Sequence, residues 1–181
     1  MLNKNILKNT IKNYILGGST DVDASANAWA DAYDAYANGM VSYAQDQSGD
    51  RVITVNKTAL IAGLKTAFTN GTAAGSASGI ASAVLLYWTG GIFGILMPPT
   101  IVDPLAISDV SAVVINPGTG LASALQTEFS NLSTDADAKA EAIATVFDNN
   151  AKTVQVLCNY LKTNVVPPPP FLPGVATLSV S

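Results

Sequence analysis

The chain contains no histidine, one cysteine and one arginine among its 181 residues. Without histidine it cannot use imidazole as a general base, as part of a Ser-His-Asp or Cys-His nucleophile system, or as a metal ligand. A lone Cys158 excludes a disulfide within the chain and a CxxC site, and we expect it to be a buried apolar side chain in a helix. With Arg51 as the only guanidinium, bidentate phosphate recognition is limited to one residue.

Charge is scarce as well. Charged residues make up 12% of the chain, with nine Lys and Arg against thirteen Asp and Glu, so that the net charge is −4 and the pI is about 4.5. An acidic chain poor in arginine is unsuited to binding nucleic acid. The basic cluster Lys4, Lys8 and Lys12 follows i, i+4 spacing, and we expect it to form a solvated helix face. The first 16 residues lack a continuous apolar run, so we expect no secretory signal.

What the chain does contain is an internal repeat. At an offset of 114, Ser19–Ala37 matches Ser133–Ala151 with ten identities in nineteen positions, including a shared Ser-Thr-Asp-x-Asp opening. At an offset of 61, Thr58–Asn70 matches Thr119–Asn131 with six identities in thirteen. With two residues fewer in the turn, Ile80-Ala81 then matches Ile143-Ala144. The matches predict three units, each a short helix, a turn and a longer helix.

The predicted fold is therefore mainly α, with three repeated helical hairpins packed in one domain. The units span about 2–47, 51–100 and 112–166, and a Pro-rich C-terminal segment covers 167–181. Each short helix carries one apolar stripe at i, i+4, i+8 spacing, formed by Leu7, Ile11 and Ile15, by Leu60, Leu64 and Phe68, and by Leu121, Leu125 and Phe129.

The longer helices are predicted over Asp21–Ala44, Ser76–Ile95 and Asp135–Leu161. Capping boxes are expected at Thr20 with Asp23 and at Thr134 with Asp137, where side-chain oxygens and early carboxylates suit a helix N-terminus. A few short β-strands are expected between hairpins and at the C-terminus, over Arg51–Val55, Ala112–Ile115 and Ala176–Val180. The run Pro167–Pro170 predicts a stiff polyproline spacer, or alternatively a ligand for a groove of the SH3 or WW type.

The middle of the chain carries no charge from Thr66 to Val102. Within it, Gly79–Met97 is long and apolar enough for a membrane-spanning helix. Its aromatic pair Tyr87-Trp88 lies at the centre of the run, however, and no Lys or Arg flanks it. We therefore expect a helix buried in the core or at a subunit interface, and a membrane-inserted segment is the alternative.

Small residues favour close packing of the helices, with large aromatic groups filling the gaps. The aromatic and C-terminal apolar residues are also candidates for contacts with partner subunits. The interface candidates are Trp29, Tyr33, Tyr36, Tyr87, Trp88, Phe93, Pro168 and Phe171.

A search for catalytic chemistry gives no candidate residue. Gly118-x-Gly120 lacks the third glycine of a dinucleotide fingerprint, and no GxxxxGK[ST] loop occurs. Asp46-x-Ser48-x-Asp50 starts like a calcium loop, but Arg51 replaces the required glycine. We expect no enzymatic activity, cofactor, metal or small-molecule substrate.

The repeat, the low-charge composition and the stretch TALIAGLKTAFTN…ASAVLLYWTGGIF resemble small structural proteins of tailed-phage virions. The resemblance implies a passive subunit of a viral particle at the neck, tail or baseplate, or on the capsid. It implies copies of the chain itself and other virion proteins as partners, and it offers no catalytic or binding residues. A small membrane-associated protein inserting residues 79–97 is the alternative function, and an adaptor that docks through Pro167–Pro170 is a third.

Overall fold

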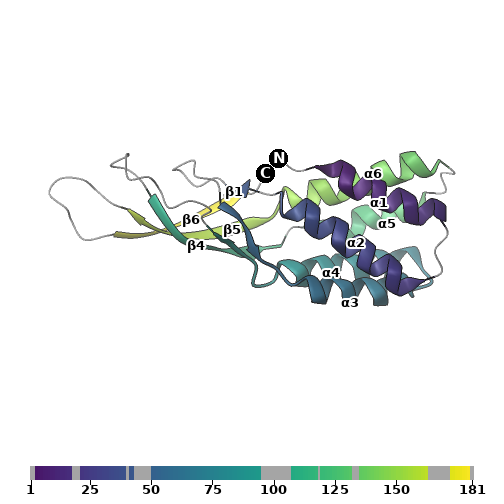
Figure 1. Ribbon diagram of the computed structural model, residues 1–181, viewed down its shortest axis with the longest axis horizontal. Coiled ribbons are helices and arrows are strands. Elements are labelled where there is room, and N and C mark those ends of the chain that lie inside the picture. Colours follow the sequence, from purple (N-terminus) through teal and green to yellow (C-terminus); the bar gives the residue numbers. More distant parts are fainter. Residues whose placement is uncertain are drawn as a thin grey trace.

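A computed structural model of the chain describes residues 3–17, 21–39, 41–42, 50–94, 107–117, 119–131, 135–162 and 172–179. It is elongated: the helices gather into a bundle at one end, and the strands β4, β5 and β6 extend away from it at the other (Figure 1). The fold is mainly α.

The bundle closes on itself. Each helix packs against the next one along the chain, and α6 returns to pack against α1, so that the first and last helices lie side by side (Figure 1). The helices are α1 Lys4–Gly17, α2 Val22–Ala37, α3 Lys57–Phe68, α4 Ala73–Trp88, α5 Leu121–Ser130 and α6 Ala136–Ala151.

The strands form one antiparallel sheet in which neighbours in the sequence are neighbours in space. They are β1 Val41–Ser42, β2 Asp50–Thr54, β3 Ile92–Gly94, β4 Ile107–Asn116, β5 Gln155–Lys162 and β6 Leu172–Ser179. The strands β4 and β6 are longer than the segments predicted over Ala112–Ile115 and Ala176–Val180.

The core lies along the bundle axis and is formed first by the apolar stripes of the short helices. Six stripe residues are at most 5% exposed, which confirms their predicted burial: Leu7, Ile11, Leu60, Leu64, Leu121 and Leu125. Phe68 and Phe129 are partly buried against the same core. The stripes are buried because residues four apart share one helix face, which each helix turns toward the centre.

Two predicted long helices end earlier than expected. Helix α2 stops at Ala37 rather than at Ala44, because the amide of Asn38 closes its last turn and β1 follows. Helix α4 stops at Trp88 rather than at Ile95, because Gly90 takes a φ of +74°, a left-handed conformation that favours glycine. The apolar run Gly79–Met97 is therefore not one continuous helix.

The prediction of a helix over Asp135–Leu161 is also wrong. Helix α6 ends at Ala151, and the following residues enter strand β5. Cys158 thus lies in a strand, opposite Ala112 of β4 and Ala176 of β6. The segment is rich in residues that suit a strand, and hydrogen bonding to neighbours on both sides favours the extended form over continuing the helix.

The long helices are capped one residue later than the predicted capping boxes. The Asp21 side chain accepts a hydrogen bond from the Ala24 amide, and the Asp135 side chain accepts from the amides of Asp137 and Ala138. A short carboxylate satisfies the free amides and also suits the positive end of the helix dipole.

Some sequence predictions fall outside the described residues. These are the threonines of the capping boxes, most of the loop Asp46–Asp50, the run Pro167–Pro170 and the interface candidate Phe171. Phe93 lies in β3, and its side chain is not described. Pro168 belongs to the proline run.

Candidate functional site

Most of the aromatic interface candidates lie inside the bundle. Tyr33, Tyr36, Tyr87 and Trp88 are at most 3% exposed, so this structure gives them no surface for a partner subunit. The Trp88 Nε1–H donates to the Tyr33 hydroxyl at 2.8 Å, and the Tyr33 ring packs edge-on against the Tyr87 ring at 5.2 Å. Trp29 is partly buried and packs edge-on against other rings. The aromatic cluster therefore holds α2 against α4.

Two buried tyrosines donate to carboxylates on another long helix. The Tyr36 hydroxyl donates to Asp148 Oδ1 at 2.6 Å, and the Tyr87 hydroxyl donates to Asp34 Oδ1 at 2.9 Å. Burial raises the pKa of both phenols well above its ordinary value, so both stay protonated donors. Burial by itself would raise the pKa of Asp148, but hydrogen bonds from Lys152 and Tyr36 outweigh it and hold that pKa below its usual range.

The sequence predicted that the lysines of α1 form a solvated helix face. In the structure they form ion pairs with α6 instead. Lys4 pairs with Glu141 at 2.5 Å, Lys8 with Asp137 at 2.9 Å, and Lys12 with Asp137 at 2.8 Å. These pairs link α1 to α6, a helix more than a hundred residues away in sequence. The junction of α2 and α3 is charged as well, through Lys57 to Asp31 and Asp34 and through Lys65 to Asp23.

The α1–α6 ion pairs predict an acid-sensitive contribution to stability. Hydrogen bonds from Lys12 and Lys8 hold the pKa of Asp137 below its ordinary value, and Lys4 lowers the pKa of Glu141. A lowered carboxyl pKa stabilises the fold above the unfolded value of about 4, and this contribution is lost as the pH falls through the lower folded value. We expect the urea midpoint to fall less between pH 7 and pH 2 in Lys8→Met than in the parent chain.

Gln126→Met is the control for this change, because Gln126 is exposed on α5. It should show the parental acid sensitivity. An equal fall of the midpoint in Lys8→Met and in the parent would contradict a stabilising role for the ion pairs.

The α1–α6 and α2–α3 junctions are held by ion pairs. The junction of α4 with α5 and the end of α6 has no charged residue in its lining. It holds a groove of about 220 Å³ in which no lining residue is charged. The groove is lined by Ser78, Ala81, Ser82, Val84, Leu85, Pro117, Gly120, Leu121, Ala122 and Asn150. Leu85 of the lining is 49% exposed, and Leu86, the next residue along α4, is 46% exposed. These two are the large apolar side chains that the described part of the chain leaves exposed.

The wall of the groove carries unused hydrogen-bonding capacity. Asn150 is 5% exposed, and its Nδ2 donates to the Thr119 carbonyl at 3.1 Å. Its Oδ1 is buried and has no hydrogen-bond partner among the described residues. Helix α5 begins at the same wall, where Gly120 has a φ of +75° and no side chain caps the helix. We take this groove as the candidate functional site.

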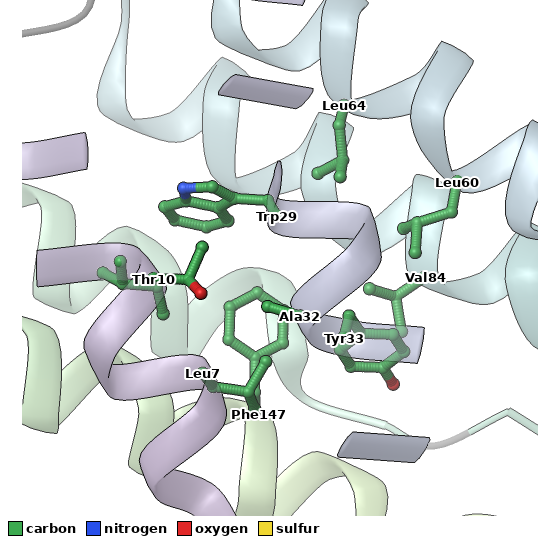
Figure 2. A pocket seen from close by; sticks show the side chains of 10 residues that line it. Leu7, Thr10, Trp29, Ala32, Tyr33, Leu60, Leu64, Val84 and Phe147 are labelled. Atoms are coloured by element: carbon green, nitrogen blue, oxygen red, sulfur yellow. The ribbon is translucent and has the colours of Figure 1, made fainter. Parts of the chain in front are cut away.

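A second cavity lies inside the bundle but is too small to hold a ligand. Its volume is about 10 Å³, and Figure 2 shows Trp29, Thr10 and Phe147 around it. A space of this size accommodates no more than a water molecule. It is a packing gap in the core.

Comparison with protein families, with curated protein sequences and with solved structures found no match for this chain. The described residues hold no group of three or more His, Cys, Asp or Glu side chains placed to bind a metal ion. None of the described helices is long and apolar enough to cross a membrane.

Leu85, Leu86 and Asn150 were not among the residues that the sequence pointed to. A signal was present in the repeat register, which aligns Leu85 with Asp148 and Asn150 with Tyr87. Each substitution exchanges a member of a tyrosine–carboxylate pair for a residue that cannot form it. In the sequence, this junction is marked by departures from the repeat rather than by agreement with it.

Proposed function

We propose that the chain is a non-enzymatic structural subunit of a viral particle of the tailed-phage type, at the neck, tail or baseplate. It assembles there with copies of itself and with other virion proteins. The resemblance in repeat, composition and the stretches 58–70 and 81–93 supports the class of particle. The observation that carries the assembly role is the exposed pair Leu85 and Leu86 beside the uncharged groove.

This pair supports assembly because the rest of the described bundle buries its large apolar side chains wholly or in part. Adjacent exposed leucines next to an uncharged groove are typical of a surface that another molecule covers. Removing the exposed half of each leucine from water contributes about 1 kcal/mol. The uncharged wall allows that contact without desolvating an ion.

We also propose that the bundle is built from the internal repeat. Three hairpins, α1–α2, α3–α4 and α5–α6, are proposed to be copies of one unit, with strands connecting them. The burial of the stripe residues at matching repeat positions in α1, α3 and α5 supports this. So does the cyclic order, in which the long helix of each hairpin packs against the short helix of the next and α6 packs against α1.

Self-association is the first test. We expect light scattering on a size-exclusion peak, prepared without detergent, to give a discrete oligomer. Replacing both exposed leucines, Leu85→Glu with Leu86→Glu, should weaken the association at least about tenfold, because covering the surface would then bury carboxylates.

The matched control places two glutamates elsewhere on the same hairpin, at the exposed positions Ala62 and Ala74. Ala62→Glu with Ala74→Glu should assemble like the parent. A parent chain that stays monomeric at high concentration and gives no crosslinked partner contradicts the proposal. Recovery in detergent alone would favour the membrane-associated alternative.

A further inference from the structure

The repeat registers make three sets of positions equivalent. An offset of 114 relates the first long helix to the third, and an offset of 63 relates the second to the third, so an offset of 51 relates the first to the second. Tyr36, Tyr87 and Asn150 thus occupy one position, and Asp34, Leu85 and Asp148 occupy another. The three junctions between hairpins can then be compared residue by residue.

At two junctions this pair of positions forms a phenol–carboxylate hydrogen bond. Tyr36 of α2 reaches Asp148 of α6, and Tyr87 of α4 reaches Asp34 of α2. By the same cyclic rule, Asn150 of α6 should face Leu85 of α4. Both line the groove, as the rule requires.

A lysine completes the two polar junctions. Lys57 bonds Asp31 at 2.8 Å and Asp34 at 3.3 Å, and the equivalent Lys4 bonds Glu141 and the Thr145 hydroxyl. At the third junction the sequence has Gly118 in the position of the lysine. There, Ser82 stands where Asp31 stands, and Leu85 where Asp34 stands. The third junction has lost the lysine, the carboxylates and the tyrosine together.

The groove is the space that these replacements leave. Asparagine lacks the aromatic ring of tyrosine, and a volume of about 220 Å³ remains beside it. A protein cavity of about 150 Å³ holds a benzene molecule, so the space admits one phenol ring. The exposed Leu85 side chain in the lining can cover such a ring.

We propose that this groove binds the phenol ring of a tyrosine presented by a partner polypeptide. Charge complementarity favours an uncharged occupant, because no lining residue is charged and an ion would be desolvated without a counter-charge. Once the Asn150 side chain turns toward the ring, its unpartnered Oδ1, which is buried in the free chain, accepts a hydrogen bond from the phenol hydroxyl, and the uncapped start of α5 supplies amide donors to the phenol oxygen. The partner's tyrosine thus takes the place that the chain's own tyrosines fill at the other two junctions.

The identity of the partner rests on the proposed assembly role, but ring binding is a property of the single chain. It is tested with 4-methylphenol, the side chain of tyrosine, against toluene, which has the same ring without the hydroxyl. Ligand-detected NMR titrations use the full chain at a concentration where light scattering shows a monomer. We expect 4-methylphenol to bind about fivefold more tightly than toluene, the effect of one net hydrogen bond.

Two substitutions locate the binding. Ser82→Leu extends an exposed side chain into the groove and should abolish binding of both probes, whereas Ala74→Leu, on the same helix but outside the groove, should leave it unchanged. Asn150→Leu should remove the preference for 4-methylphenol. Because that variant loses the bond to Thr119 and can misfold, Ser82→Leu decides the location independently.

Each outcome separates this inference from the assembly role. Equal affinity for the two probes, no binding, or binding that Ser82→Leu leaves intact would overturn the tyrosine site even if the protein oligomerises through Leu85 and Leu86. Selective, Ser82-sensitive binding by a chain that never associates would support the site and contradict the proposed self-assembly.

Discussion

Replacing Trp88 by alanine is expected to lower the free energy of unfolding by about 4 kcal/mol. Trp88 is fully buried, ends α4 and packs edge-on against Tyr87 at 5.0 Å. Its Nε1–H also donates to the Tyr33 hydroxyl, whose pKa is raised by burial. Removing the indole leaves a cavity in the aromatic cluster and removes the donor to a buried hydroxyl.

Urea unfolding at pH 7, followed by far-ultraviolet circular dichroism, measures this loss. Trp29→Ala is the matched control, because Trp29 is only partly buried and packs at the edge of the same core. It should cost less than Trp88→Ala, because Trp29 buries a smaller share of its area. Equal losses in the two variants would contradict a central role for Trp88. Trp88→Phe should fall between the parent and Trp88→Ala, since it keeps most of the ring contacts and loses the hydrogen bond.

Gly63→Ala is expected to lower the free energy of unfolding by about 2 kcal/mol, although alanine is the better helix former. A Cβ at Gly63 of α3 would lie 2.5 Å from the Ala83 Cβ of α4 and 3.0 Å from its Cα. Gly79 makes the reciprocal approach, with a Cβ 2.8 Å from the Ala67 Cβ. The two helices are therefore too close for another methyl group without a shift of the backbone.

A second substitution tests the steric explanation directly. Ala83→Gly in the Gly63→Ala background should recover part of the loss, giving a favourable coupling of about 1 kcal/mol in a double-mutant cycle. Gly71→Ala is the control, because a Cβ there meets nothing within 4 Å. Additive effects of the two changes at positions 63 and 83 would refute a direct contact between them.

The apolar stripes show how far local spacing predicts this fold. Leu60 and Leu64 of α3 are buried as predicted. Residues four apart project from one face of a helix, and an apolar face is buried by turning it toward the other helices. The end of α6 was not predictable in the same way. The residues after Ala151 suit a strand as well as a helix, and hydrogen bonds to β4, more than thirty residues away in the sequence, decide for the strand.

The partners of the charged and aromatic side chains depended even more on distant contacts. The sequence placed Lys4, Lys8 and Lys12 on one face correctly, but it could not show that Asp137 and Glu141 of α6 face them. Tyr87 was selected as an interface residue because it is aromatic, and the structure places it against Asp34 in the core. Composition alone does not distinguish a core aromatic residue from an interface residue, since both bury apolar area.

By itself, the sequence determined that the fold is mainly helical, which faces of the short helices turn inward, and that histidine chemistry is absent. Those properties depend on composition and on spacing within a few turns. The closure of α6 on α1, the ends of the long helices, the ion-pair partners and the uncharged groove beside α4 were decided by tertiary structure. They arise from contacts between residues far apart in the chain, whose energies depend on which surfaces meet once the bundle has closed.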